Sequence, residues 1–294
     1  MPVRSIIFAL SAGILWGLVP LYIKFVDAAD PYEIVVQRAF WSLVLLWYIC
    51  MARRHLGAVR LMVTTPRIAG QFFVTMIFLT LNWGIYVYAV QTEQVVAAAL
   101  GYFIYPLCTV LLGMILLDEK LDRWAWMAIG LVLVGVWTKA AMIQGVPWIS
   151  LMLAGSFSVY AVLRKRMGLD PTQGLLVETI MLSPLVIAFF GWMLAKDIPL
   201  FFGGGAINFA LAITAGVLTV IPLILFHAGN RELSMTMASL IFYSNPTMQL
   251  LVGIVLFGEL FSPRDLWTFG FIWAGIALYF TTRQRVGRVT PPHV

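Results

Sequence analysis

The amino-acid sequence predicts an all-α membrane protein with ten transmembrane helices, built from two inverted five-helix repeats. Of its 294 residues, 62% are hydrophobic and 11% are charged, and the mean hydropathy is +0.94. An ordinary soluble domain has about 25% charged residues, so this composition excludes that class. The apolar residues form runs of about 20, the length that crosses a bilayer core of about 30 Å. The third observation is a similarity between the two halves of the chain.

Ten apolar runs account for most of the chain. The first run begins just after Arg4, and a basic residue before an apolar run is also typical of a signal peptide. This run, however, reaches Lys24 and contains bulky Trp16 and Tyr22 where a cleavage site needs small residues. We therefore expect a helix that is retained in the protein. The second and seventh runs follow Asp30-Pro31 and Asp170-Pro171, which are typical helix starts. The expected spans are residues 5–24, 32–52, 70–90, 94–117, 123–141, 147–163, 172–194, 207–229, 233–258 and 264–282.

Positive charge follows the topology of the chain. The isoelectric point near 9.5 could indicate nucleic-acid binding, but the basic residues do not form one patch, so no nucleic-acid partner is expected. With the N-terminus inside, fourteen of the 19 basic residues fall on the inner side. They are Arg4, Arg53, Arg54, Arg60, Arg67, Lys120, Arg123, Arg164, Lys165, Arg166, Arg231, Arg283, Arg285 and Arg288. The positive-inside rule therefore predicts that both termini are cytoplasmic.

The two halves align when the chain is shifted by 140 residues against itself. The stretch "AALGYFIYPLCTVLLGMILLDEKLDRWAWMAIGLVLVG" then lies over "ASLIFYSNPTMQLLVGIVLFGELFSPRDLWTFGFIWAG" without a gap. Any two apolar helices share leucines, but these also match Pro106 with Pro246, Glu119 with Glu259, Gly130 with Gly270 and Gly135 with Gly275. The predicted repeats are residues 1–144 and 145–294. Because five helices is an odd number, the second repeat enters the membrane inverted, which is a common plan of secondary transporters.

Several segments resemble the drug/metabolite transporter superfamily, EamA type, and within it the RarD branch. They are "WGLVPLYIK" from Trp16, "QRAFWS" from Gln37, "NWGIYVYAV" from Asn82, "LGYFIYPL" from Leu100, "SFSVYAVLRKR" from Ser156, "LLVETIMLSP" from Leu175 and "FGFIW" from Phe269. The resemblance covers nearly the whole chain. It implies the ten-helix EamA-type transporter fold, a bacterial inner-membrane location, and export or exchange of small molecules. The chain departs from the expected pattern at Val95, Val96 and Ala97, where the family favours an acidic residue.

Prolines inside the spans remove backbone hydrogen bonds and can free carbonyl groups toward a cavity. We expect Pro20, Pro106, Pro184, Pro222 and Pro246 to interrupt their helices. Pro106 and Pro246 occupy equivalent repeat positions, as broken helices at a transport site do. Hinge or cavity-lining roles are therefore predicted for Pro106, Pro222 and Pro246; the alternative is that these kinks only shape packing.

Aromatic and amide groups lie well inside the spans as well as at their ends. Such groups suit a pocket for a planar or weakly polar small molecule, although many serve packing alone. Buried amides must find partners, because lipid offers none. The predicted substrate pathway comprises Trp16, Pro20, Asn82, Trp83, Tyr86, Tyr102, Tyr105, Tyr160, His227, Tyr243 and Asn245.

Arg38 and Glu178 occupy equivalent positions inside the second and seventh spans. Each lies seven residues past a helix-starting proline, and hence about 10 Å deep from opposite faces. An unpaired arginine at the centre of a span costs about 2.5–3.5 kcal/mol, so a partner is expected. We predict that the two residues form a charge pair or gate. The alternative is that Arg38 and Glu178 reach outward and inward separately to headgroups.

Two further polar groups have alternative roles. Histidine is the side chain whose unperturbed pKa lies near neutrality, so His227 is a candidate proton carrier, while the competing interpretation is a satisfied packing group. Glu119 and Glu259, at the ends of the fourth and ninth spans, are expected to cap neighbouring helix starts or to pair with basic loop residues.

These features together favour a carrier. Neither a disulfide nor a metal cluster is expected, since Cys50 and Cys108 both fall in spans. The sequence contains no phosphate-binding glycine loop, zinc spacing or nucleophile elbow, so no catalytic site or cofactor is expected. We predict export or exchange of small organic molecules, such as amino acids or chloramphenicol. The alternatives are a membrane enzyme acting on lipid-linked substrates and a passive channel; proton coupling and the choice between monomer and homodimer stay open.

Overall fold

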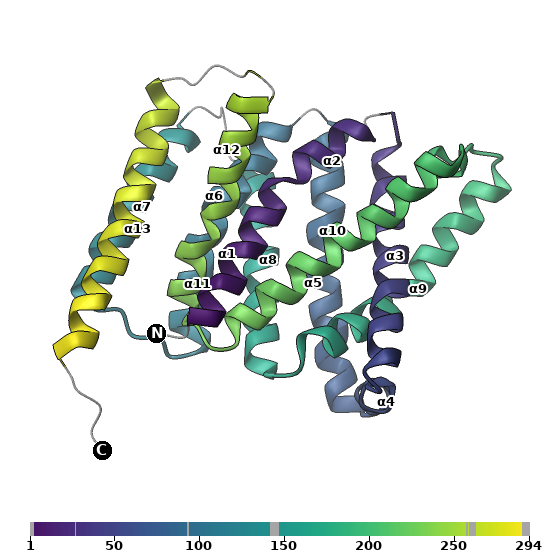
Figure 1. Cartoon of the computed structure of the whole chain (residues 1–294), viewed down its shortest axis with the longest axis horizontal. Helices are drawn as coiled ribbons and strands as arrows, with labels where there is room; N and C mark the ends of the chain where they lie inside the picture. The colour runs from purple at the N-terminus through teal and green to yellow at the C-terminus, as the bar shows by residue number, and fades with distance from the viewer. Residues whose placement is uncertain are drawn as a thin grey trace.

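The computed structural model describes residues 3–26, 28–92, 94–141, 147–256, 258 and 263–289, and every regular element among them is helical (Figure 1). Helices occupy all ten predicted positions, so the all-α fold is confirmed. The elements are α1 (Val3–Gly17), α2 (Val19–Phe25), α3 (Pro31–Ala52), α4 (Leu56–Thr64), α5 (Pro66–Gln91), α6 (Val95–Leu116), α7 (Arg123–Ala140), α8 (Trp148–Met167), α9 (Pro171–Ala195), the short 3₁₀ helix η1 (Phe201–Gly203), α10 (Ala206–Asn230), α11 (Met235–Phe242), α12 (Ser244–Leu256) and α13 (Pro263–Val289).

The helices are suited to a bilayer. Among the described residues, seven helical stretches are long and apolar enough to cross a membrane, and α7 and α13 contain shorter apolar stretches. Large apolar side chains also face outward: Trp137, Ile187 and Val255 are 72%, 68% and 72% exposed. So many exposed apolar groups fit contact with lipid rather than with water. The chain is therefore a multi-pass membrane protein.

The predicted starts of α3 and α9 are confirmed in detail. Asp30 accepts hydrogen bonds from the backbone N–H groups of residues 32 and 33, and Asp170 accepts them from residues 172 and 173. Each cap is followed by a proline at the first helical position, where the missing N–H costs nothing. The short helix α4 was not predicted; it fills the connection between α3 and α5.

The prediction that five prolines interrupt their spans is only partly correct. The first span breaks at Leu18, next to Pro20, and the ninth breaks at Tyr243, three residues before Pro246. By contrast, α6, α9 and α10 continue through Pro106, Pro184 and Pro222. Helix breaks were expected at both Pro106 and Pro246, which occupy equivalent repeat positions, but only the span that contains Pro246 is broken.

Hydroxyl groups bond to backbone carbonyl oxygens of α6 close to Pro106. The carbonyl oxygen of Tyr105 accepts hydrogen bonds from Thr109 Oγ1 at 2.8 Å and from Ser158 Oγ at 3.1 Å. The carbonyl oxygen of Phe103 accepts one from the Tyr243 hydroxyl at 2.8 Å. Of these carbonyl groups, that of Phe103 lies in the turn before the proline, so the bond from Tyr243 supports the backbone where α6 passes through Pro106.

α7 and α13 pack side by side at one edge of the bundle (Figure 1), through positions that the two halves share. A Cβ atom on Gly135 would lie 2.7 Å from the carbonyl oxygen of Thr268, and one on Gly275 would lie 2.7 Å from that of Ala128. Gly275 and Ala128 are the residues 140 positions from Gly135 and Thr268. Reciprocal contacts of this kind arise at a two-fold axis. The helices are antiparallel, because the later part of α7 meets the earlier part of α13, as inverted repeats require.

Candidate functional site

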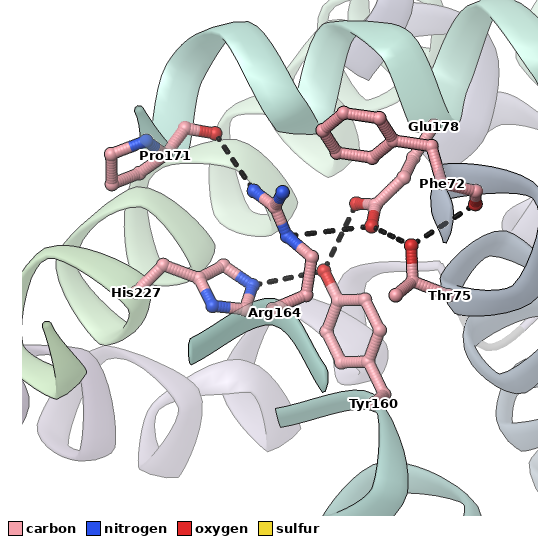
Figure 2. A network of polar contacts seen from close by, with 7 residues as sticks. All are labelled: Phe72, Thr75, Tyr160, Arg164, Pro171, Glu178 and His227. Carbon is pink, nitrogen blue, oxygen red and sulfur yellow. Dashed lines mark hydrogen bonds and ion pairs between the residues drawn. The ribbon is translucent and has the colours of Figure 1, made fainter. Parts of the chain in front are cut away.

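A buried polar network surrounds Glu178, in the interior of the bundle (Figure 2). The Glu178 side chain is 1% exposed. Its Oε1 accepts a hydrogen bond from Thr75 Oγ1 at 2.6 Å, and its Oε2 accepts one from the Tyr160 hydroxyl at 3.1 Å. Arg164 Nε lies 3.4 Å from Oε1, within ion-pair distance. The carboxylate therefore has a cation and two hydrogen-bond donors around it.

His227 extends this network through Tyr160. Its Nε2 lies 2.9 Å from the Tyr160 hydroxyl oxygen. A phenol has one hydrogen to donate, and Tyr160 donates it to Glu178. His227 must then be the tautomer with its hydrogen on Nε2, which donates to the Tyr160 oxygen. The three side chains form a continuous hydrogen-bonded chain from an imidazole to a carboxylate.

Local structure places these groups together. Tyr160 and Arg164 are one turn apart on α8, so they share a face of that helix. Arg164 also lies over the Phe72 ring, at 5.1 Å from its centre, and its Nη2 donates to the Pro171 carbonyl oxygen at 3.4 Å. Gly174 provides the space for the guanidinium, because a Cβ atom there would overlap it. The start of α9 therefore accommodates the cation that Glu178 needs.

Arg164, Thr75 and Gly174 were not among the predicted site residues. Arg164 was counted with the basic residues at the inner end of its span, since it begins the run Arg164-Lys165-Arg166. Its position one turn after Tyr160 was the available signal. The sequence offered no comparable sign for Thr75, which reaches Glu178 from a helix 103 residues away in the chain.

The ion pair is almost completely removed from solvent. The side chains of Arg164 and Glu178 are 2% and 1% exposed. Arg164 Nε and Nη1 have no hydrogen-bond partner, so the attraction between the charges is not reinforced by good hydrogen-bond geometry. Removing one partner of such a pair costs about 3–5 kcal/mol, because the other charge stays buried.

Arg38 and Glu178 do not form the predicted direct pair. Arg38 Nε instead donates to Thr219 Oγ1 at 3.0 Å, and its guanidinium lies over the Trp83 ring at 5.4 Å from the ring centre. Among the described residues, no ion pair joins Arg38 to a carboxylate. The repeat alignment pointed to Arg38 as the charged partner of Glu178, whereas Arg164 on α8 lies within ion-pair distance of it. A role of Arg38 and Glu178 as a gate stays a prediction.

A small cavity lies between the two charged positions. Trp83 and Thr219, which contact Arg38, line it together with Glu178. It offers about 10 Å³ to water-sized molecules, roughly what one water needs. Outside it, a cleft of about 390 Å³ is lined by Arg67, Arg166 and Thr75, among others. Thr75 therefore borders the cleft, Glu178 borders the cavity, and their hydrogen bond lies between the two spaces.

The other predicted pathway residues fall into separate groups. Trp83, Tyr86 and Tyr102 gather around Arg38, which interacts electrostatically with both phenols. Trp16 and Tyr105 pack in an aromatic cluster with Phe157 and Phe242.

The remaining residues are held by hydrogen bonds or lie at breaks and turns. Asn82 Nδ2 donates to the Leu153 carbonyl oxygen at 2.9 Å, and Asn245 accepts from Gln249 at 2.7 Å. Tyr243, Pro20, Pro106, Pro222 and Pro246 lie in or beside the helices as described above.

The cap predicted for Glu119 is confirmed. Its carboxylate accepts hydrogen bonds from the backbone N–H groups of Met235 and Thr236 at 2.5 and 3.2 Å, at the start of α11. The equivalent Glu259 lies outside the described residues. Among the residues that the structure does describe, no group of three metal-ligating side chains occurs.

Comparisons with known proteins identify relatives of the whole chain. The model of the EamA-like transporter family matches residues 3–138. The chain is 34% identical to an uncharacterized transporter of Pseudomonas aeruginosa, over 98% of this chain and 97% of that protein. It is 31% identical to protein RarD of Escherichia coli, over 94% of this chain and 93% of that protein. A solved crystal structure with 17% sequence identity superposes with a TM-score of 0.73, covering 95% of this chain and 97% of that chain, and so shares its fold.

Proposed function

The chain belongs to the drug/metabolite transporter superfamily, in the RarD branch of its EamA-type members, and we propose that it is a secondary carrier working by alternating access. The family supports a membrane transporter of small molecules. Our proposal adds that it exports or exchanges small organic molecules, such as amino acids or chloramphenicol, across the bacterial inner membrane. Both termini are cytoplasmic in this proposal, and the two five-helix halves, residues 1–144 and 145–294, rock against each other.

One observation carries the proposal: the Thr75–Glu178 hydrogen bond joins a residue that lines a cleft to a residue that lines an internal cavity. Arg67 and Arg166, which line the cleft, are among the residues expected on the cytoplasmic side. Thr75 belongs to the first half and Glu178 to the second. The contact is therefore a closed cytoplasmic gate between the halves.

The energies of the two kinds of contact suit such a gate. A hydrogen bond to a charged group contributes about 1.5–3 kcal/mol, so the Thr75–Glu178 contact can break in each cycle. Breaking the Arg164–Glu178 pair would cost about 3–5 kcal/mol, but both residues lie in the second half and move together. Rocking thus opens the gate without separating buried charges.

Uptake and counterflow in proteoliposomes test the proposal. Candidate solutes are amino acids, amphenicols and organic cations, each measured with and without a pH gradient. Saturable counterflow is the expected result. Unsaturable flux would indicate a channel, and chemical conversion of a lipid-linked substrate would indicate an enzyme; either outcome contradicts the proposal.

A further inference from the structure

Arg38 lies inside a membrane span, and no carboxylate among the described residues forms an ion pair with it. Its Nε donates to Thr219, and its guanidinium covers the Trp83 ring. In the described part of the chain, no hydrogen bond or ion pair engages its two terminal nitrogen atoms. Charged groups inside spans normally pair with each other or face a functional pathway. Since Arg38 has no charged partner among the described residues, we expect it to face a functional pathway.

The contrast with Glu178 strengthens this interpretation. The two residues are repeat-equivalent, yet Glu178 is 1% exposed and is neutralised by Arg164, whereas Arg38 is only partly buried. The site of Glu178 is complete within the protein. Within the described part of the chain, the site of Arg38 contains no opposite charge, and its accessible surface allows a ligand to supply one.

The surroundings of Arg38 indicate the rest of the ligand. Among the described residues, the phenols of Tyr22, Tyr86 and Tyr102 are close enough to interact electrostatically with Arg38. Tyr22 donates to the Leu211 carbonyl oxygen, whereas the hydroxyls of Tyr86 and Tyr102 make no hydrogen bond within the described residues and are free to donate. Trp83, Tyr86 and Tyr102 are all partly accessible, so they offer aromatic surface beside the cation.

We propose that Arg38 is the anion-binding residue of the transport pathway, and that the transported molecule joins a carboxylate to a planar apolar body. The guanidinium fork matches the two oxygens of a carboxylate, and the phenols of Tyr86 and Tyr102 donate further hydrogen bonds to it. One positive charge matches one carboxylate better than a doubly charged phosphate. This inference rests on the proposed carrier function and specifies its substrate class.

Thermal unfolding of the purified, detergent-solubilised protein tests the inference with paired probes. The pairs are benzoate with benzamide, phenylacetate with phenylacetamide, and indole-3-acetate with indole-3-acetamide. A ligand that binds the folded state raises the unfolding temperature according to its affinity. We expect the carboxylates, and not the amides, to stabilise the wild-type protein.

Variants assign the effect to Arg38. Arg38→Gln should weaken carboxylate binding at least tenfold, which corresponds to about 1.4 kcal/mol, and Arg38→Lys several-fold. Arg53→Gln removes a cation from the exposed end of the same helix and should bind as the wild type does. If Arg38→Gln fails to fold, Arg38→Lys carries the test by itself.

Three results would overturn the inference: equal effects of acids and amides, unchanged carboxylate affinity in the Arg38 variants, or stabilisation by none of the probes. Counterflow separates this failure from failure of the carrier proposal. Saturable counterflow of neutral or cationic solutes without a preference for carboxylates rejects only the substrate class. Absence of saturable counterflow for every solute rejects the carrier function itself.

Discussion

Thr75 on α5 donates a hydrogen bond of 2.6 Å to Glu178 on α9, and this contact joins the two halves of the chain where the cleft ends and the internal cavity begins. The bond is short, buried and directed at a charged acceptor. It is a hydrogen bond that crosses from one half to the other, as does the contact of Arg164 with the Phe72 ring, whereas Tyr160, Arg164 and His227 belong to the half that contains Glu178.

Replacing Thr75 by valine should loosen the gate. Valine keeps the shape of the side chain but cannot donate, and loss of a hydrogen bond worth about 1.5–3 kcal/mol shifts an opening equilibrium roughly tenfold or more. The measurement is the labelling rate of Thr179→Cys, which lines the cavity. The variants are made in a protein from which Cys50 and Cys108 have been removed. Inverted membrane vesicles expose the cleft to a thiol reagent that cannot cross the membrane. Thr75→Ser keeps the donor and is the control; equal labelling of both variants would contradict the gate.

Gly174→Ala should displace the Arg164 guanidinium, because the added methyl group occupies its position. Overpacking of this kind costs about 1–3 kcal/mol and would lower the unfolding temperature. Gly191→Ala is a matched control on the same helix, since a Cβ atom there meets nothing within 4 Å. If both variants unfold at the same temperature, Gly174 has no role in accommodating the cation.

The glycines between α7 and α13 provide a test of the two-fold relation. Gly135→Ala and Gly275→Ala should each destabilise the protein by about 1–3 kcal/mol, because the added methyl groups meet backbone carbonyl oxygens at 2.7 Å. Their effects should be similar, and less than additive in the double variant, because either substitution separates the same two helices. Gly130→Ala and Gly270→Ala form the control pair, as a Cβ atom at either meets nothing within 4 Å. Clearly unequal effects of the two substitutions would contradict the two-fold relation between Gly135 and Gly275.

Exchanging the charges of Arg38 and Glu178 should not restore transport. Repeat equivalence alone predicts rescue, as for two partners of one pair. In the structure, however, Arg164 neutralises Glu178, so Glu178→Arg would place a second guanidinium beside the first. We expect the double variant to transport no better than either single variant in counterflow. Partial rescue would instead support direct coupling of Arg38 and Glu178 in another conformation.

His227→Gln tests whether the hydrogen-bonded side chains of His227, Tyr160 and Glu178 conduct a proton. Glutamine cannot titrate, so the response of uptake to a pH gradient should disappear while counterflow stays within about twofold of wild type. Tyr160→Phe interrupts the same chain and should give the same loss of response. His55→Gln, at the start of α4, changes a histidine outside the network and is the control. Unchanged dependence on the gradient in His227→Gln would remove this residue from coupling.

The sequence was sufficient wherever the signal was local or periodic. The positions of the ten spans follow from apolar length, and the starts of α3 and α9 follow from Asp-Pro caps that act within four residues. The shift of 140 residues identified Gly135 and Gly275 as equivalents before their reciprocal contacts were seen. The place of Glu119 at a span end predicted either a helix cap or a pair with basic loop residues, and the structure shows the cap.

Tertiary packing decided how the buried charges are balanced and which prolines break a helix. Arg164 rather than Arg38 neutralises Glu178, because the Arg164 side chain reaches the start of α9, where Gly174 leaves room for the guanidinium. α6 passes through Pro106, and the Tyr243 hydroxyl, from the break between α11 and α12, bonds to the Phe103 carbonyl oxygen in the turn before that proline. Electrostatic and hydrogen-bond partners act over a few ångströms in space, and residues 50 to 180 positions apart reach that range only after the helices have packed.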